Sequence, residues 1–285
     1  MWKESYKIGV EHIDRQHKQL FEYVDAMAAT LKKQQSFEDY KNQIVEAIGF
    51  LKQYCVEHFK DEEAYHLEIG LKDHQAHKQL HQKLVKDVLA HEAELTGSGF
   101  APESVKKFLG FVLTWLIYHV AGEDQKLGTK AAAKAPDTTE VSGSVQDFAT
   151  RAKGVLCTVT GLSDEDISFA KSAGSIKDGV GFKVGLVDGG GKKGVGLVYS
   201  TTIALGALKA MTSMEVDEIN EITYSALQEI SNIVSSRIAD SVAAAAGIAF
   251  VDIEYPVQTP IEHIPKGNDS FIMKTSIGDM EVVVY

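Results

Sequence analysis

The sequence predicts two folded domains of different class: an all-α four-helix bundle, followed by an α+β domain with helices packed on a sheet. Three observations support this division. Apolar residues recur at three- and four-residue spacing in four segments of residues 11–127. A stretch of small and polar residues follows, and beyond it apolar and β-branched residues alternate as they do in strands. Nine of the ten histidines precede residue 120, so we expect the two halves to carry different chemistry.

Length and composition agree with two soluble domains. The 285 residues are enough for about two domains of roughly 150 residues each. We expect a bundle over residues 1–128, a linker over 129–144 and a second domain over 145–285. The longest apolar run, residues 242–251, is about half of the roughly 20 residues that cross a bilayer, and the N-terminus lacks the apolar core of a signal peptide. We therefore expect a cytoplasmic protein with no membrane partner. The net charge of -11 argues against nucleic acid as a partner.

Each of the four helical segments places histidine on its apolar face. The segments are separated by breaks near residues 34–36, 70 and 96–102. His58 and Glu62 continue the apolar stripe of the second segment, and His77 and His81 begin that of the third. His17 lies on the stripe of the first segment, and His119 on that of the fourth.

The four helices together point to metal binding. One histidine on an apolar face is usually a hydrogen-bonded core residue. Burying several imidazoles and a carboxylate without partners would cost several kcal/mol, whereas coordination to a metal compensates for that cost. A shared metal site is the simplest interpretation.

The motifs around these residues resemble those of the hemerythrins, specifically the bacterial ones. They are DRQHKQLF, HFKDEE, HKQLH and WLIYHVAGEDQKL, all within residues 1–128. The resemblance implies a centre of two non-haem iron ions, with five terminal histidine ligands and two bridging carboxylates, and O2 as the ligand of one open coordination position. The implied ligands are His17, His58, Glu62, His77, His81, His119 and Asp124. Nitric oxide could enter the same position.

Two details of the ligand set can be examined in the sequence. Ferritin-like di-iron bundles need Glu-x-x-His on two helices, whereas this chain has one such pair, Glu63 and His66, which we expect at the surface. We expect His74 beside the ligands or exposed. His119 and Asp124 are five residues apart, about 140° around an ideal helix, so the helix must distort near Gly122 for both to reach the metal.

The second half predicts two hairpins and two helices. Residues 182–188 and 194–200 flank a glycine-rich turn, and residues 271–276 and 281–285 flank IGDM. Residues 201–211 and 217–246 have helical patterns. The segment 189–194 matches GxGxxG, but no helix follows it, so we interpret it as a hairpin turn.

The helix predicted over residues 217–246 carries a polar stripe. Ser225, Glu229 and Asn232 step by four and three residues along one face, and such a face is usually solvated. The stretches GVGLVYSTTIALGALKAM and DEINEITYSALQEISNIVSSRIADSV resemble the CheX branch of the CheC, CheX and FliY chemotaxis phosphatases. Ser236 stands where that family usually has glycine.

The second resemblance implies an activity. It predicts hydrolysis of the aspartyl phosphate of a CheY-type response regulator, with Mg2+ bound by the regulator. Asn232 would orient the attacking water, and Glu229 would pair with the regulator's active-site lysine. The family also implies a homodimer.

We therefore expect an oxygen-responsive signalling protein in which a di-iron sensor is joined to a phosphatase. Two alternatives stay open. The bundle could store O2 beside a non-catalytic docking domain, or the centre could be an enzyme acting on peroxide or nitric oxide.

Overall fold

The chain forms two compact units, Met1–Ala135 and Pro136–Tyr285. The computed structural model describes residues 2–31, 36–127, 144–171, 174, 176–187, 193–212, 216–246, 252–267 and 269–285. Most of the predicted linker, 129–144, lies outside the described residues, so its limits stay a prediction. No helix in the described ranges combines the length and apolar character needed to span a bilayer.

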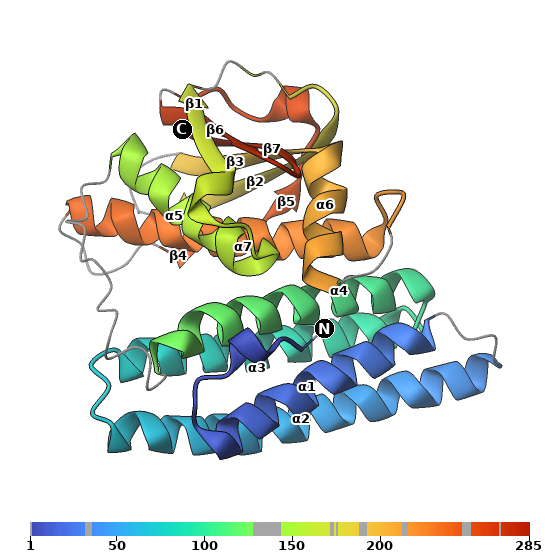
Figure 1. The fold of residues 1–285 in the computed structure, drawn as a ribbon. Helices are drawn as coiled ribbons and strands as arrows, with labels where there is room; N and C mark the ends of the chain where they lie inside the picture. The colour runs from blue at the N-terminus through green and yellow to red at the C-terminus, as the bar shows by residue number, and fades with distance from the viewer. Residues whose placement is uncertain are drawn as a thin grey trace. The chain divides into compact units, whose positions relative to one another are not determined.

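Four long helices make up the N-terminal unit and run side by side in Figure 1. This confirms the predicted helical class. They are α1 (Glu11–Thr30), α2 (Phe37–Glu68), α3 (His74–Gly97) and α4 (Pro102–Tyr118), preceded by the short 3-10 helix η1 (Glu4–Tyr6). A π-helix, η2 (His119–Glu123), and a 3-10 helix, η3 (Asp124–Lys126), continue α4.

Local sequence signals define the helix limits. The Ser36 side chain accepts a hydrogen bond from the Asp39 backbone N–H and so caps α2. Gly70 follows α2 with φ of 65°, a left-handed conformation that glycine adopts without strain. Pro102 occupies the first turn of α4, where a missing N–H costs nothing.

The C-terminal unit is an α+β domain, as the sequence predicts. Its sheet has the strand order β1-β6-β7-β3-β2-β4 with β5 also paired to β2, and all pairs are antiparallel. The strands are β1 (Ile167–Lys171), β2 (Gly179–Val187), β3 (Lys193–Ser200), β4 (Asp252–Ile253), β5 (Val257–Gln258), β6 (Asp269–Thr275) and β7 (Gly278–Val284). The helices are α5 (Val145–Thr160), η5 (Asp164–Asp166), α6 (Thr201–Thr212), α7 (Glu221–Ala246) and η6 (Ile261–His263).

Both predicted hairpins are present. β2 pairs with β3 up to Leu186 opposite Lys193, and β6 pairs with β7 up to Thr275 opposite Gly278. The turn residues 188–192 lie outside the described residues. The long helix begins at Glu221 rather than at residue 217, because the Asn220 side chain accepts hydrogen bonds from the backbone N–H groups of Ile222 and Thr223 and acts as its N-cap.

The two faces of the sheet are covered differently. α5, α6 and α7 pack against one face, where the Tyr199 hydroxyl lies 2.9 Å from that of Ser231. Residues 254–259 continue along the edge of β2, where the Glu254 and Thr259 backbone N–H groups donate to the Gly185 and Gly181 carbonyl oxygens. The chain then turns onto the other face, where Ile264 packs against a small buried cluster. Glycine at 181 and 196 makes room for this segment, since a Cβ at Gly181 would lie 2.5 Å from the Thr259 backbone oxygen.

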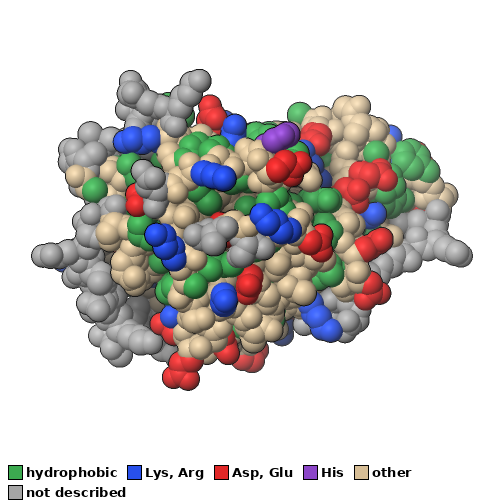
Figure 2. All heavy atoms as spheres, turned by 90° about the horizontal axis from the view of Figure 1, so that it is seen from above, with side chains coloured by type: hydrophobic (Ala, Val, Ile, Leu, Met, Phe, Trp, Pro, Cys, Tyr) green, Lys and Arg blue, Asp and Glu red, His purple; other side chains and the backbone are tan. Residues whose placement is uncertain are grey.

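Charges are mixed on the surface. On the face shown in Figure 2, basic and acidic side chains are interspersed among apolar ones. The coloured atoms of this view form no broad patch of a single charge.

The close approach at Gly181 gives a test of the fold. We expect Gly181→Ala to destabilise the C-terminal unit by about 1–3 kcal/mol, because backbone atoms cannot yield easily. Urea unfolding followed by far-UV circular dichroism measures the change. Gly154→Ala in α5 is the control: the added Cβ meets no atom within 4 Å, so this variant should be as stable as the wild type or up to about 1 kcal/mol more stable. Equal stability of Gly181→Ala and the wild type would contradict the described packing.

Candidate metal centre

The seven residues that the sequence predicts as metal ligands meet in the interior of the bundle. Each is at most 6% exposed. They come from every long helix or its continuation: His17 from α1, His58 and Glu62 from α2, His77 and His81 from α3, His119 from η2, and Asp124 from η3.

The helix that follows α4 distorts where the sequence requires it. Residues 119–123 form a π-helix, and the Asp124 backbone N–H donates to the His119 carbonyl oxygen five residues earlier. The wider turn brings the side chains of His119 and Asp124 to one side, so that the His119 Nε2 lies 3.1 Å from the Asp124 Oδ1. The predicted distortion near Gly122 is confirmed.

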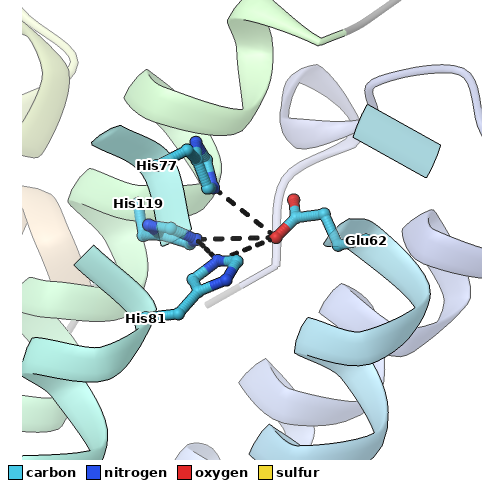
Figure 3. Close-up of side chains that lie close together, drawn as sticks. All are labelled: Glu62, His77, His81 and His119. Carbon is cyan, nitrogen blue, oxygen red and sulfur yellow. Dashed lines mark hydrogen bonds and ion pairs between the residues drawn. The ribbon is translucent and has the colours of Figure 1, made fainter. Parts of the chain in front are cut away.

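Two groups of donor atoms share one carboxylate. Glu62, His77, His81 and His119 form the first group, and His17, His58 and Glu62 form the second. Figure 3 shows the first, in which three imidazoles from α3 and η2 converge on one Glu62 oxygen. The Nε2 atoms of His81, His77 and His119 lie 2.9, 3.5 and 3.9 Å from it. In the second group, the His58 Nε2 lies 4.0 Å from the same oxygen.

Asp124 also joins the two groups, with one oxygen toward each. Its Oδ2 lies 3.2 Å from the His17 Nε2, and its Oδ1 lies 3.3 Å from the His77 Nε2. The carboxylates of Glu62 and Asp124 therefore both lie between the pair of histidines and the set of three.

The cluster is strongly coupled electrostatically. Burial and the Glu62 charge raise the pKa of Asp124, but His119, His17 and His77 outweigh them and lower it to about 2. Burial opposes a charge on His77, yet Asp124 and Glu62 raise its pKa to about 10. Burial, reinforced by nearby His17, lowers the pKa of His58 to about 3. Burial raises the pKa of Glu62, but the histidines around it, His119, His77 and His81 among them, hold it well below the usual value. Both carboxylates are thus ionised at neutral pH and available as ligands.

The donor set fits a cation. Both oxygens of Glu62, both of Asp124 and both ring nitrogens of His17 are buried and make no well-aligned hydrogen bond among the described residues, although imidazoles and carboxylates lie within 4.0 Å of one another. Buried polar groups are normally paired, because leaving one unpaired costs about 1–3 kcal/mol. Imidazole and carboxylate donors without thiolate suit iron.

Two further contacts orient the ligands from outside. The His81 Nδ1 lies 3.3 Å from the Glu63 Oε1, and the Lys78 ammonium donates to the Glu63 Oε2 at 2.7 Å. The His58 Nδ1 lies 3.1 Å from the Gln16 Oε1, and the Gln16 amide donates to Asp61 at 2.8 Å. Both contacts leave Nε2 as the nitrogen that faces the centre.

Aromatic rings cover the histidines. The Phe59 ring stacks on His81 with centroids 3.9 Å apart, and Trp115 stacks on His119 at 4.3 Å. These rings restrict the orientation of two ligands and exclude water from their faces.

The predicted surface position of Glu63 and His66 is wrong. We expected Glu63 and His66 at the surface, but Glu63 is partly buried against His81, and His66 is 0% exposed. The His66 ring lies 4.6 Å from that of His77 and 5.7 Å from that of His74, which is partly buried. A signal was present, because His58, Glu62 and His66 are spaced by four residues and so continue one stripe of α2.

The three polar side chains of the α7 stripe lie on one side of the helix, and they are not exposed as those of a solvated face would be. Ser225, Glu229 and Asn232 are 2%, 2% and 4% exposed. The Asn232 amide donates to both Glu229 carboxylate oxygens at 3.3 Å. Glu229 and Asn232 lie about 160° and 100° around the helix from Ser231, which faces the sheet. The Ser236 hydroxyl donates back to the Asn232 carbonyl oxygen at 2.9 Å.

The comparisons with known proteins divide at the same place as the fold. Residues 8–131 match the family model described as the hemerythrin HHE cation binding domain. A bacteriohemerythrin from Clostridium acetobutylicum is 29% identical over 126 residues, which cover 44% of this chain and 96% of that protein. A hemerythrin-like protein from Naegleria gruberi is 29% identical over 125 residues, which cover 44% of this chain and 87% of that protein.

Solved structures resemble the C-terminal half. The chemotaxis protein CheX from Vibrio vulnificus has 19% identity and a TM-score of 0.40, covering 50% of this chain and 98% of that one. CheX in a CheX–CheY–BeF3–Mg2+ complex from Borrelia burgdorferi has 23% identity and a TM-score of 0.41, covering 49% of this chain and 95% of that one.

The N-terminal unit is therefore a hemerythrin HHE domain, a class of cation-binding helical bundle that implies non-haem iron. It is joined in this chain to an α+β unit whose structural neighbours are CheX-like proteins.

Trp115 provides a readout of metal binding, because its ring stacks on His119. In a Trp2→Phe background Trp115 is the only tryptophan. We expect anaerobic Fe(II) to change its fluorescence and to saturate near two ions per chain. At a free Fe(II) concentration of about 100 times the Kd of each position, each bound ion should stabilise the bundle by about 2.7 kcal/mol.

Glu62→Ala in the same background removes the residue shared by both donor groups and should abolish the saturable signal. A wild-type response without saturation would contradict the assignment of the metal centre.

Proposed function

We propose that the chain is an oxygen-responsive signalling protein that acts in the cytoplasm. In this proposal, the bundle binds O2 at a di-iron centre, and the C-terminal unit dephosphorylates a CheY-type response regulator. The observation that carries the first part is the pair of donor groups joined by Glu62 and Asp124.

The two donor groups are unequal, and this inequality supports a ligand-binding role. His77, His81 and His119 would hold one ion, and His17 and His58 the other, with Glu62 and Asp124 as ligands to both. The second ion would have one histidine fewer, so the open coordination position would belong on the side of His17 and His58.

The residues of the chain prepare this position. When bound, a di-iron centre supplies the redox change and the open coordination position that reversible O2 binding requires. Buried apolar side chains from three helices, among them Leu20, Leu51 and Val112, adjoin the histidine stripes and exclude water. Gln16 holds the His58 ring through its Nδ1.

The phosphatase part of the proposal rests on the motif of α7. Asn232 carries a neutral amide that can orient a water molecule in line with an aspartyl phosphate, while Mg2+ and a lysine of the regulator neutralise charge. Glu229, one turn earlier on the same side of α7, would pair with that lysine and dock the helix. A homodimer stays a prediction of the family resemblance.

Regulation by O2 requires a difference between two states. O2 can change phosphatase activity only if the bundle binds it with unequal affinity in the active and inactive states of the C-terminal unit. Covalent fusion of the two units motivates this coupling.

Removal of one histidine ligand tests the O2 site. We expect His17→Leu to retain about half of the iron and to lose reversible O2 binding, measured by metal analysis and by the visible absorption spectrum of the reduced protein on addition of O2. His12→Leu removes an exposed histidine of the same helix and should behave as the wild type. Steady consumption of peroxide or nitric oxide by the wild type, without reversible oxygenation, would favour a di-iron enzyme instead.

Substitution of Asn232 tests the proposed phosphatase activity of the C-terminal unit. We expect Asn232→Ala to slow phosphate release from a phosphorylated CheY-type regulator by about a hundredfold, because the water loses its orientation. Asp240→Ala alters an exposed residue of the same helix and is the control.

The same assay on reduced, deoxygenated protein and after addition of O2 tests the coupling. Identical rates would remove regulation from the proposal. Unchanged release by Asn232→Ala would leave the C-terminal unit as a docking domain.

A further inference from the structure

The contacts outside the ligand set differ between the two halves of the centre. One histidine of the three-histidine group is held by a carboxylate, and one histidine of the two-histidine group is held by an amide. Neither Glu63 nor Gln16 is a member of the donor groups themselves.

Each of the two Glu63 carboxylate oxygens has its own partner on α3. Glu63 lies one residue after the shared ligand Glu62 on α2 and places its Oε1 3.3 Å from the His81 Nδ1. Its other oxygen accepts a hydrogen bond from Lys78 at 2.7 Å, and Lys78 and His81 lie one turn apart on α3. Because an ionised carboxylate only accepts hydrogen bonds, the His81 Nδ1 is the protonated nitrogen and Nε2 is free to bind a cation.

The amide contact has a fixed direction for a similar reason. The Asp61 carboxylate can only accept, so it takes the hydrogen bond from the Gln16 NH2 group at 2.8 Å. The Gln16 carbonyl oxygen is therefore the atom turned toward the His58 Nδ1, 3.1 Å away. This contact fixes the same tautomer as Glu63 does for His81, but a neutral group makes it.

We propose that Glu63 and Gln16 are positioning residues that make the two halves of the centre electronically unequal. Glu63 increases electron donation by His81 to its ion, whereas Gln16 orients His58 without adding charge. This inference rests on the proposed di-iron centre and adds to it the residues that set its asymmetry.

The effect of Glu63 has a definite sign. A negative charge hydrogen-bonded to a ligand imidazole raises the basicity of the ligand and favours the higher oxidation state of the ion. Glu63→Gln should therefore raise the reduction potential of the iron-loaded protein and weaken metal binding by about tenfold or more. Lys78→Met leaves Glu63 in place without its counter-charge and should shift the potential in the opposite direction.

The amide should act differently. Gln16→Leu removes the acceptor for His58 without changing charge. We expect it to lower the occupancy of the two-histidine half and to leave the potential of the fully loaded protein close to that of the wild type.

The test uses the full chain. Potentials are measured anaerobically on iron-loaded protein against redox dyes, and affinity is measured by competition with a chelator, using Zn(II) as the probe. The 15N spectrum of the Zn(II)-loaded protein reports which nitrogen of His81 and of His58 carries the proton. Asp87→Asn is the matched control, because it removes another lysine-paired carboxylate of the bundle.

Opposite shifts for Glu63→Gln and Lys78→Met, with Asp87→Asn unchanged, would support the proposal. Equal potentials and affinities in the wild type, Glu63→Gln and Lys78→Met would overturn it. Failure of the wild type to bind two ions would instead overturn the di-iron proposal, so the two failures are distinguishable.

Discussion

The pairing of two carboxylates with five imidazoles inside the bundle is the interaction on which the N-terminal unit depends. Glu62 and Asp124 are both 0% exposed and lie 2.9 and 3.1 Å from ligand imidazole nitrogens, yet neither makes a well-aligned hydrogen bond within the described residues. Such a cluster is costly to bury unless a cation completes it. The four helices, the π-turn after α4 and the aromatic rings over His81 and His119 all serve to hold these groups in one place.

Helical spacing made most of this centre predictable. Histidines that extend apolar stripes must point inward. Asp124 was implied only by the hemerythrin resemblance, and its five-residue separation from His119 then required the distorted helix that the structure contains. The surrounding contacts were not predictable in the same way. Glu63 and His66 follow Glu62 on α2, and the sequence alone does not reveal that Lys78 neutralises Glu63 or that His77 and His74 cover His66. Both depend on how α3 packs against α2.

In the C-terminal unit, the strands could be predicted from the sequence more fully than the surroundings of the polar stripe. Alternating β-branched residues predicted both hairpins, because register and turn are local features. The start of α7 was misjudged by four residues, since Asn220 was not identified as a cap. The spacing of Ser225, Glu229 and Asn232 predicted a shared side of the helix but not the low exposure of the three side chains. The N-terminal unit thus holds a metal centre inside its core, whereas the proposed activity of the C-terminal unit requires a partner to reach the motif on α7.

Iron X-ray absorption on the loaded, full-length protein tests the central claim most directly. The shared carboxylates predict two irons per chain, coordinated only by nitrogen and oxygen, with a second iron at about 3.5–4 Å from the first. A single iron per chain without an iron neighbour would contradict a centre in which Glu62 and Asp124 belong to both metal positions.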